Sequence, residues 1–132
     1  MARLENVIFC LTATRSSNQI SANNIMAVLT PEYIPGLFSF SVILTVLDVE
    51  PNSKHMIYVK FIDQHQEVIG EAKGEVILED NSNIPSEYKG LNITINWTNL
   101  NIKTTGLYQL IVYWDTNQIG EKEIYVQGKI EK

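Results

Sequence analysis

The chain has 132 residues, of which 45% are hydrophobic and 19% are charged. This length and composition predict one globular domain over residues 1–132 and argue against extensive disorder. The formal net charge of −5 disfavours the phosphate backbone of a nucleic acid as a ligand. The uncharged, largely apolar stretch of residues 36–47 is too short to cross a bilayer, so a membrane protein is also disfavoured.

Cys10 is the only cysteine, which excludes an intramolecular disulfide and any zinc site built on several cysteines. Because it lies in an apolar run, we expect a buried and unreactive thiol. The N-terminal residues lack the long apolar core and cleavage site of a secretory signal, so the sequence favours a cytoplasmic protein.

Residues 4–14 predict a first strand that is apolar on both faces near its centre. A break follows at Ser16-Ser17-Asn18. Residues 25–29 have two interpretations, a capped helical turn or a strand, and the strand fits slightly better because Pro31 follows. Two prolines and one glycine in residues 31–36 predict a loop without sheet pairing.

The central part of the chain alternates apolar and polar residues in the pattern of strands. Residues 38–49 and 55–62 are two clear strands separated by a turn at residues 50–54. Residues 63–66 predict a hairpin turn into two further segments, 67–70 and 71–78. Gly70 and Gly74 in these segments indicate a bulge or a bend.

The polar residues 79–90 predict a long loop, and residues 91–97 alternate strictly between the core and water. Residues 106–126 predict a hairpin whose turn is residues 115–118. Its first strand, 107–114, is apolar on both faces, and Tyr108 is placed like the tyrosine of a tyrosine corner. Its second strand, 119–126, carries three charges and is predicted to be a sheet edge. Residues 127–132 are expected to be a charged tail.

Seven or eight strands at spacings of about ten residues are typical of an all-β sandwich. The sequence therefore predicts a single immunoglobulin-like or C2-like antiparallel β-sandwich. A closed barrel is the alternative, because several strands are apolar on both faces.

Three stretches carry a resemblance to a known group of proteins: residues 23–35, 55–71 and 106–114. On these stretches the chain resembles a small uncharacterised family of bacterial and phage-borne β-sandwich proteins. The resemblance implies the fold and no established activity.

No nucleophile elbow, P-loop or dinucleotide motif is present in the sequence, and we expect neither a cofactor, a metal nor an enzymatic activity. His55 and His65 are expected to be ordinary solvated histidines near strand ends. Calcium would be an alternative if the loop carboxylates met at one end of the sandwich, but they are expected to be solvated turn residues. These carboxylates are Asp48, Glu50, Asp63, Glu79 and Asp80.

Tyr33 and Tyr88 lie in predicted loops, where burial is not forced, and Trp114 lies at the hairpin end. Exposed aromatic side chains are favoured anchors at interfaces, so these three are candidates for contact with a protein. The same rings could stack on a sugar. Asn92, Thr94 and Asn96 form an uncharged outer strand face that could pair with a second copy of the chain.

The sequence thus favours a non-catalytic, cytoplasmic module that acts by stoichiometric binding to a protein. An inhibitor or adaptor encoded by a phage or a mobile element is one form of this hypothesis. A carbohydrate-binding domain or an accessory domain of a phage virion is the alternative.

Overall fold

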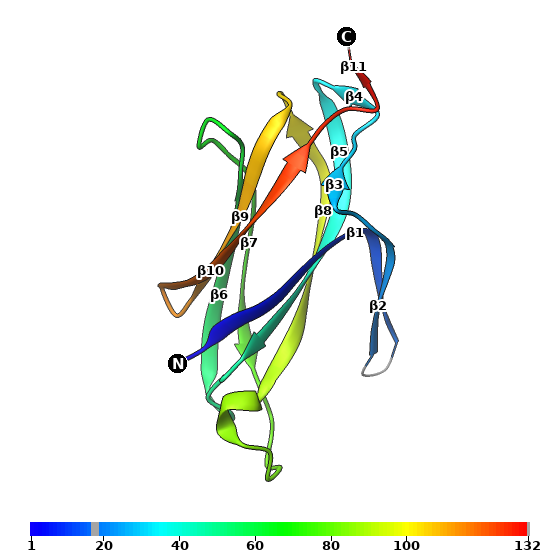
Figure 1. Cartoon of the computed structure of the whole chain (residues 1–132). Coiled ribbons are helices and arrows are strands. Elements are labelled where there is room, and N and C mark those ends of the chain that lie inside the picture. The colour runs from blue at the N-terminus through cyan, green and yellow to red at the C-terminus, as the bar shows by residue number, and fades with distance from the viewer. Residues whose placement is uncertain (17–18, 132) are drawn as a thin grey trace.

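The computed structural model describes residues 1–16 and 19–131, and it confirms the predicted β-sandwich (Figure 1). Ser17 and Asn18, on which part of the predicted break falls, lie outside the described residues, as does Lys132. The longer strands are β1 (Arg3–Ser16), β2 (Gln19–Ile25), β5 (Gly36–Leu47), β6 (Lys54–Ile62), β7 (Val68–Ile77), β8 (Gly90–Ile102), β9 (Gly106–Trp114) and β10 (Asn117–Val126).

Four shorter elements complete the structure: β3 (Val28–Leu29), β4 (Tyr33–Ile34), β11 (Ile130–Glu131) and the 3₁₀ turn η1 (Ser86–Tyr88). Residues 25–29 form no helical turn. The strand interpretation is confirmed for Ile25, the last residue of β2, and for Val28 and Leu29, whereas Met26 and Ala27 between them are not in a strand. The prediction of an unpaired loop over residues 31–36 was wrong at β4, which pairs with β11. The predicted tail is therefore ordered in part: it contains β11, and before β11 the Gln127 amide donates to the Leu29 carbonyl at 3.0 Å.

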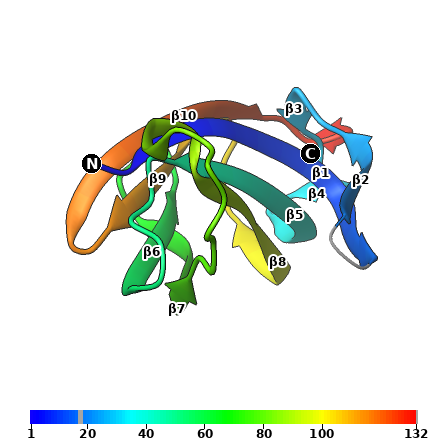
Figure 2. The same cartoon turned by 90° about the horizontal axis from the view of Figure 1, so that it is seen from below.

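The long strands form two separate sheets, which excludes the closed barrel. One sheet, here called sheet A, has the order β2-β1-β5-β8, and the other, sheet B, has the order β3-β10-β9-β6-β7. Seen end-on, β1 and β10 run close together along one side of the sandwich, while β7 and β8 are the outer strands of the opposite side (Figure 2).

The core lies between the sheets and follows from the alternation seen in the sequence. Phe40, Val42, Leu44 and Val46 of β5 are each at most 1% exposed and pack against sheet B. Tyr108 of β9 is fully buried and its hydroxyl donates to the Thr104 carbonyl at 2.6 Å, which confirms the predicted tyrosine corner.

The β9–β10 hairpin turns more tightly than predicted. Asp115 and Thr116 alone form the turn, with φ of 48° and 73°, while Asn117 and Gln118 already belong to β10. Two positive φ values are the mark of a type I′ turn, which matches the twist of the strands that it joins. Along β10 the charged residues do form a sheet edge, as predicted, because β3 pairs only with Tyr125 and Val126.

Thr116 is a β-branched residue in the left-handed region, which is an unfavourable combination. Replacing Thr116 with glycine should raise the free energy of unfolding by about 1 kcal/mol, because the left-handed cost of a side chain is removed. Urea unfolding followed by circular dichroism measures the change. The same replacement at Thr98, an extended position in β8, should lower the stability instead. If both replacements lower it equally, Thr116 is not strained.

Candidate functional site

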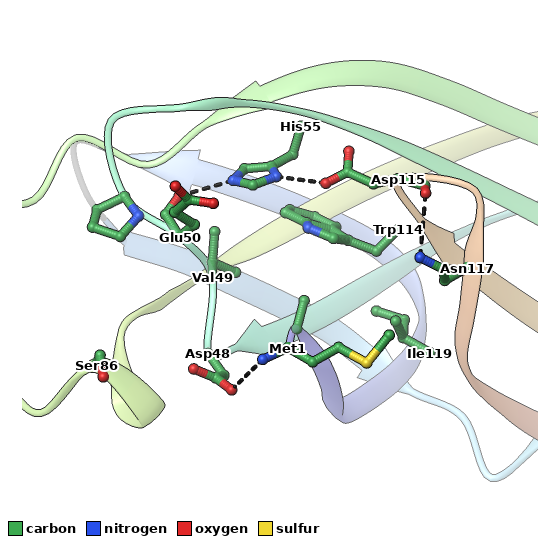
Figure 3. A pocket seen from close by; sticks show the side chains of 12 residues that line it. Met1, Asp48, Val49, Glu50, His55, Ser86, Trp114, Asp115, Asn117 and Ile119 are labelled. Carbon is green, nitrogen blue, oxygen red and sulfur yellow. Dashed lines mark hydrogen bonds and ion pairs between the residues drawn. The ribbon is translucent and has the colours of Figure 1, made fainter.

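One end of the sandwich holds a cavity of about 410 Å³ between the β5–β6 loop, the β9–β10 turn and the N-terminal residues (Figure 3). Its floor is the Trp114 indole, and the N-terminal amino group of Met1 forms a 2.8 Å ion pair with Asp48 at its mouth. The cavity is lined by Met1, Ala2, Asp48, Val49, Glu50, Pro51, His55, Ser86, Trp114, Asp115, Asn117 and Ile119.

His55 lies beside this cavity and is not solvated as predicted, since it is only 6% exposed. Its Nδ1 lies 2.7 Å from Oδ2 of Asp115, and its Nε2 lies 2.8 Å from the Glu50 backbone carbonyl. Its ring also packs on Trp114, with 5.1 Å between ring centroids. The Asp115 carboxylate reaches His55 because the left-handed turn directs it back along β6, where it also accepts the Met56 amide at 2.8 Å.

These contacts define the protonation of His55. A backbone carbonyl and a carboxylate both accept hydrogen bonds, so both contacts are hydrogen bonds only in the protonated form of His55, in which each ring nitrogen donates. Burial alone lowers the pKa of His55, but the hydrogen bonds with Asp115 and Glu50 outweigh it and raise the pKa above its ordinary value. The hydrogen bond from His55 lowers the pKa of Asp115. With both nitrogens donating, neither is available to accept a proton from a substrate.

His65 is exposed, as predicted, and lies in the β6–β7 turn. Asp63 in that turn is not a solvated acid, because it is 3% exposed and its carboxylate accepts the backbone amides of His65 and Glu67 at 2.8 and 3.0 Å. Asp63 follows β6 and Glu50 precedes it, so these two carboxylates lie at opposite ends of that strand. Glu79 and Asp80 follow β7, whose last residue Ile77 pairs with Lys54, and so lie at the Glu50 end. Among residues 1–16 and 19–131, no three potential ligands group together as a metal site.

The aromatic interface candidates lie apart. Trp114 is 5% exposed under His55, so it is not the exposed anchor that its place at a hairpin end indicated. Tyr33 and Tyr88 are 47% and 58% exposed, which fits the prediction for loop tyrosines. Tyr33 belongs to β4 at one end of the molecule and Tyr88 to the 3₁₀ turn at the other (Figure 1). The three residues therefore make no common platform.

The uncharged face predicted for residues 92–96 is present on β8. Asn92 and Asn96 accept hydrogen bonds from Thr45 and Ser41 of β5, each at 2.6 Å, which joins the two strands on the outer face of sheet A. The Thr94 hydroxyl between them is buried and has no partner within the described part of the chain. Because β8 ends sheet A and has no charged residue from Gly90 to Ile102, it is a long edge strand without protective charges.

The sequence reasoning missed the His55 clasp, by which we mean His55 with Asp115 and the Glu50 carbonyl. The signal that could have found it is Asp115, because an Asp-Thr pair between two strands is consistent with a tight turn. The direction of the Asp115 carboxylate depends on the turn type, and its partner His55 lies sixty residues away in the sequence, so the contact itself could not be predicted.

Comparison with known proteins places the fold. A family model described as a family of unknown function matches residues 5–127. None of the curated proteins matches the chain in sequence. Among solved structures, the chain is similar to an immunoglobulin-like protein from Pseudomonas aeruginosa, with a TM-score of 0.50 and 10% identity over 96% of this chain and 97% of that one.

Two further structures are less similar. A β-glucosidase from Listeria innocua has a TM-score of 0.46 and 15% identity, over 76% of this chain and 15% of that protein. An alkylpurine DNA glycosylase from Pseudomonas fluorescens has a TM-score of 0.45 and 9% identity, over 96% of this chain and 30% of that protein. Similarity at this level carries no activity to this chain. No helix within the described residues is long and apolar enough to span a membrane.

Proposed function

The chain belongs to the DUF6941 family of unknown function, and we propose that it is a non-catalytic module that binds a protein partner in a fixed stoichiometry. The observation that carries the proposal is the part of the β8 edge from Gly90 to Trp97, which has no charged side chain and lies before the bulge at Thr98 and Asn99. Edge strands present unpaired backbone groups, and proteins that do not use them usually protect them with charge, proline or a bulge. The outer face of sheet A around Asn92, Thr94 and Asn96 is the binding surface in this proposal.

The contrast between the two edges on this side of the sandwich supports the proposal. The edge of sheet B, β7, carries Glu71, Lys73 and Glu75, which all point outward and are exposed. On β8, the outward residues Asn92 and Asn96 carry amides that are already ordered by Thr45 and Ser41 of β5. Such side chains can hydrogen-bond to a partner at little additional cost in conformational entropy.

The non-catalytic part of the proposal is supported by His55. In its protonated form both nitrogens donate, to Asp115 and to the Glu50 carbonyl, and that form lacks the free lone pair of a general base. We further propose that the module acts in the cytoplasm, where a single reduced thiol such as the buried Cys10 is stable. More specifically, we propose that the protein has a bacterial or phage origin and acts as an inhibitor or adaptor of a host protein.

The net charge of −5 favours a partner with a basic surface over a second copy of this acidic chain. A homodimer through β8 remains the competing arrangement, because the strand face itself has no charge that would repel its own copy. The candidate tyrosines Tyr33 and Tyr88 lie at opposite ends of the fold, so these two do not form an aromatic platform for a carbohydrate.

Replacing Thr94 with lysine should abolish capture of the partner, because it puts a charge in the middle of the uncharged face. The fold should stay intact although Thr94 is half-buried, because the long lysine side chain can carry its ammonium group into solvent. The measurement is capture from a lysate on immobilised protein, with a glycan array in parallel. Gln118→Lys adds the same charge on exposed β10 and should capture as the unchanged protein does.

A partner captured equally by both variants, or a glycan signal without a protein partner, would contradict the proposal. Sedimentation of the purified protein tests the homodimer, because it measures whether the protein is a monomer or a dimer in solution. A dimer that Thr94→Lys converts to a monomer would show that the surface binds a second copy.

A further inference from the structure

The two neighbouring strands at one side of sheet B differ in how well their inner faces are covered. In β6 the inward residues Ile57, Val59 and Phe61 are at most 5% exposed. Their partners in β7, Gly74, Ala72 and Gly70, point to the same side because paired residues share a face. Of these three only Gly70 is buried, while Ala72, Gly74 and the next inward residue, Val76, are half-buried.

Side chains of β8 pack on the inner face of β7 at Gly70 but no longer do so at Gly74. A Cβ atom on Gly70 would lie 3.0 Å from Leu100 and 3.3 Å from Trp97, both of β8. Trp97 also donates its Nε1 proton to the Glu71 carbonyl at 3.0 Å and so ties β8 to β7. A Cβ atom on Gly74, by contrast, would meet nothing within 4 Å. Beyond the Trp97 contact, the inner face of β7 thus has no strand of sheet A opposite it.

The corresponding part of β8 is open in the same way. Its inward residues Ile95 and Trp97 are buried, but Leu91 and Ile93 are only half-buried. We call the half-buried inward residues Ala72, Gly74 and Val76 of β7, with Leu91 and Ile93 of β8, the open side. A strand added to the free edge of β8 would extend sheet A over these residues and lie opposite β7 (Figure 2).

The charges around the open side indicate which strand fits. Residues 68–90, which comprise β7, the loop after it and the start of β8, contain five acidic residues and two lysines. The acidic residues are Glu71, Glu75, Glu79, Asp80 and Glu87. This excess of negative charge favours basic residues at the ends of an incoming segment and opposes a second acidic copy. The uncharged edge of β8 itself favours a segment whose middle is uncharged.

We propose that β8 accepts an extended segment of a partner protein as an additional strand of sheet A, by β-strand addition. The segment alternates apolar residues, which cover the open side, with uncharged polar residues that continue the Asn92 and Asn96 face, and it has basic residues at its ends. This inference rests on the proposed function. It locates the binding surface more narrowly, at the backbone edge of β8 and the open side.

The test uses a model peptide in which three valines alternate with four threonines between two pairs of lysines. Titration into the full-length protein, followed by amide NMR shifts, should show saturable binding with the largest shifts in β8. The same peptide with N-methyl groups on every valine and threonine keeps the side chains and charges but loses the backbone donors. It should not bind, because strand addition requires those donors.

Gly74→Leu is the variant that tests the open side, because its side chain would fill the unoccupied space opposite the added strand. It should weaken peptide binding about tenfold, as expected for an overpacked site. Lys73→Leu adds the same side chain on the outer face one residue away and should bind within about twofold of the unchanged protein, since that face is not part of the site.

Equal binding of the two peptides, or equal affinity of the Gly74 and Lys73 variants, would overturn strand addition. Self-association that the peptide does not displace would do so as well, in favour of a second copy. If a lysate partner is still captured in a manner sensitive to Thr94→Lys, the binding function stands while strand addition fails. If no partner is captured, the proposed function itself fails.

Discussion

Replacing Trp97 with alanine should lower the free energy of unfolding by about 3–5 kcal/mol, the range for removal of a large buried aromatic side chain. Trp97 is 8% exposed and packs on Phe40 and Phe61, with ring centroids 5.6 and 5.9 Å away. It is also the side chain that joins the edge strands of the two sheets through the Glu71 carbonyl. The loss therefore combines a cavity with the separation of β8 from β7.

Trp97→Phe separates these two effects, because it keeps most of the packing and removes the indole N–H. It should lower the free energy of unfolding by about 1–2 kcal/mol, because one hydrogen bond is lost and the side-chain volume decreases slightly. Thr98→Ala, at the exposed neighbouring position, should change it by less than about 0.5 kcal/mol. Urea unfolding followed by far-ultraviolet circular dichroism measures all three. A loss below about 1 kcal/mol in Trp97→Ala would show that β8 does not depend on this contact.

The stability of the protein should fall as the pH rises above 6.5, because the His55 clasp loses its proton. The pKa of His55 is raised above its ordinary value of 6.5 by its acceptors, so the stabilisation is fully present below 6.5 and is lost as the pH rises through the raised pKa. The pKa of Asp115 is lowered below 3.8, so its share is present above 3.8 and is lost in stronger acid. The clasp therefore contributes most between these two limits.

His55→Gln removes the titrating group and should flatten the decline above pH 6.5. Because Asp115 is 46% exposed and its charge is screened by solvent, we expect the clasp to contribute about 1 kcal/mol near pH 6. Thermal unfolding at a series of pH values gives the profile. His65→Gln makes the same change at an exposed histidine and should keep the decline. Parallel profiles for the unchanged protein and His55→Gln would refute a protonated clasp.

The sequence predicted those parts of the fold that depend on local alternation. Leu91, Ile93, Ile95 and Trp97 of β8 do face the core, because a strict period of two leaves only one possible buried face. The tyrosine corner at Tyr108 was predictable for a similar reason, since its partner Thr104 is four residues away. The alternation of apolar and polar residues does not predict the order in which the strands pair within each sheet.

The features that carry function depend on contacts between distant residues. His55 and Asp115 both looked like ordinary turn residues, and only the left-handed turn places them 2.7 Å apart. Trp114 looked exposed at a strand end, but the His55 clasp covers it. The open side is likewise invisible in the sequence, because Ala72, Gly74 and Val76 alternate as a buried strand does. They remain half-buried because the pairing order leaves no strand opposite them.

Amide hydrogen exchange on β8 tests the central claim most directly, because it reports on the edge through which the partner is proposed to bind. In the free protein, the β8 amides that do not pair with β5 should exchange rapidly. In the complex with a protein captured from the lysate, the same amides between Gly90 and Ile102 should become protected, while those of β10 keep their rates. Protection confined to β10, or to the loops around Tyr33 and Tyr88, would contradict the account.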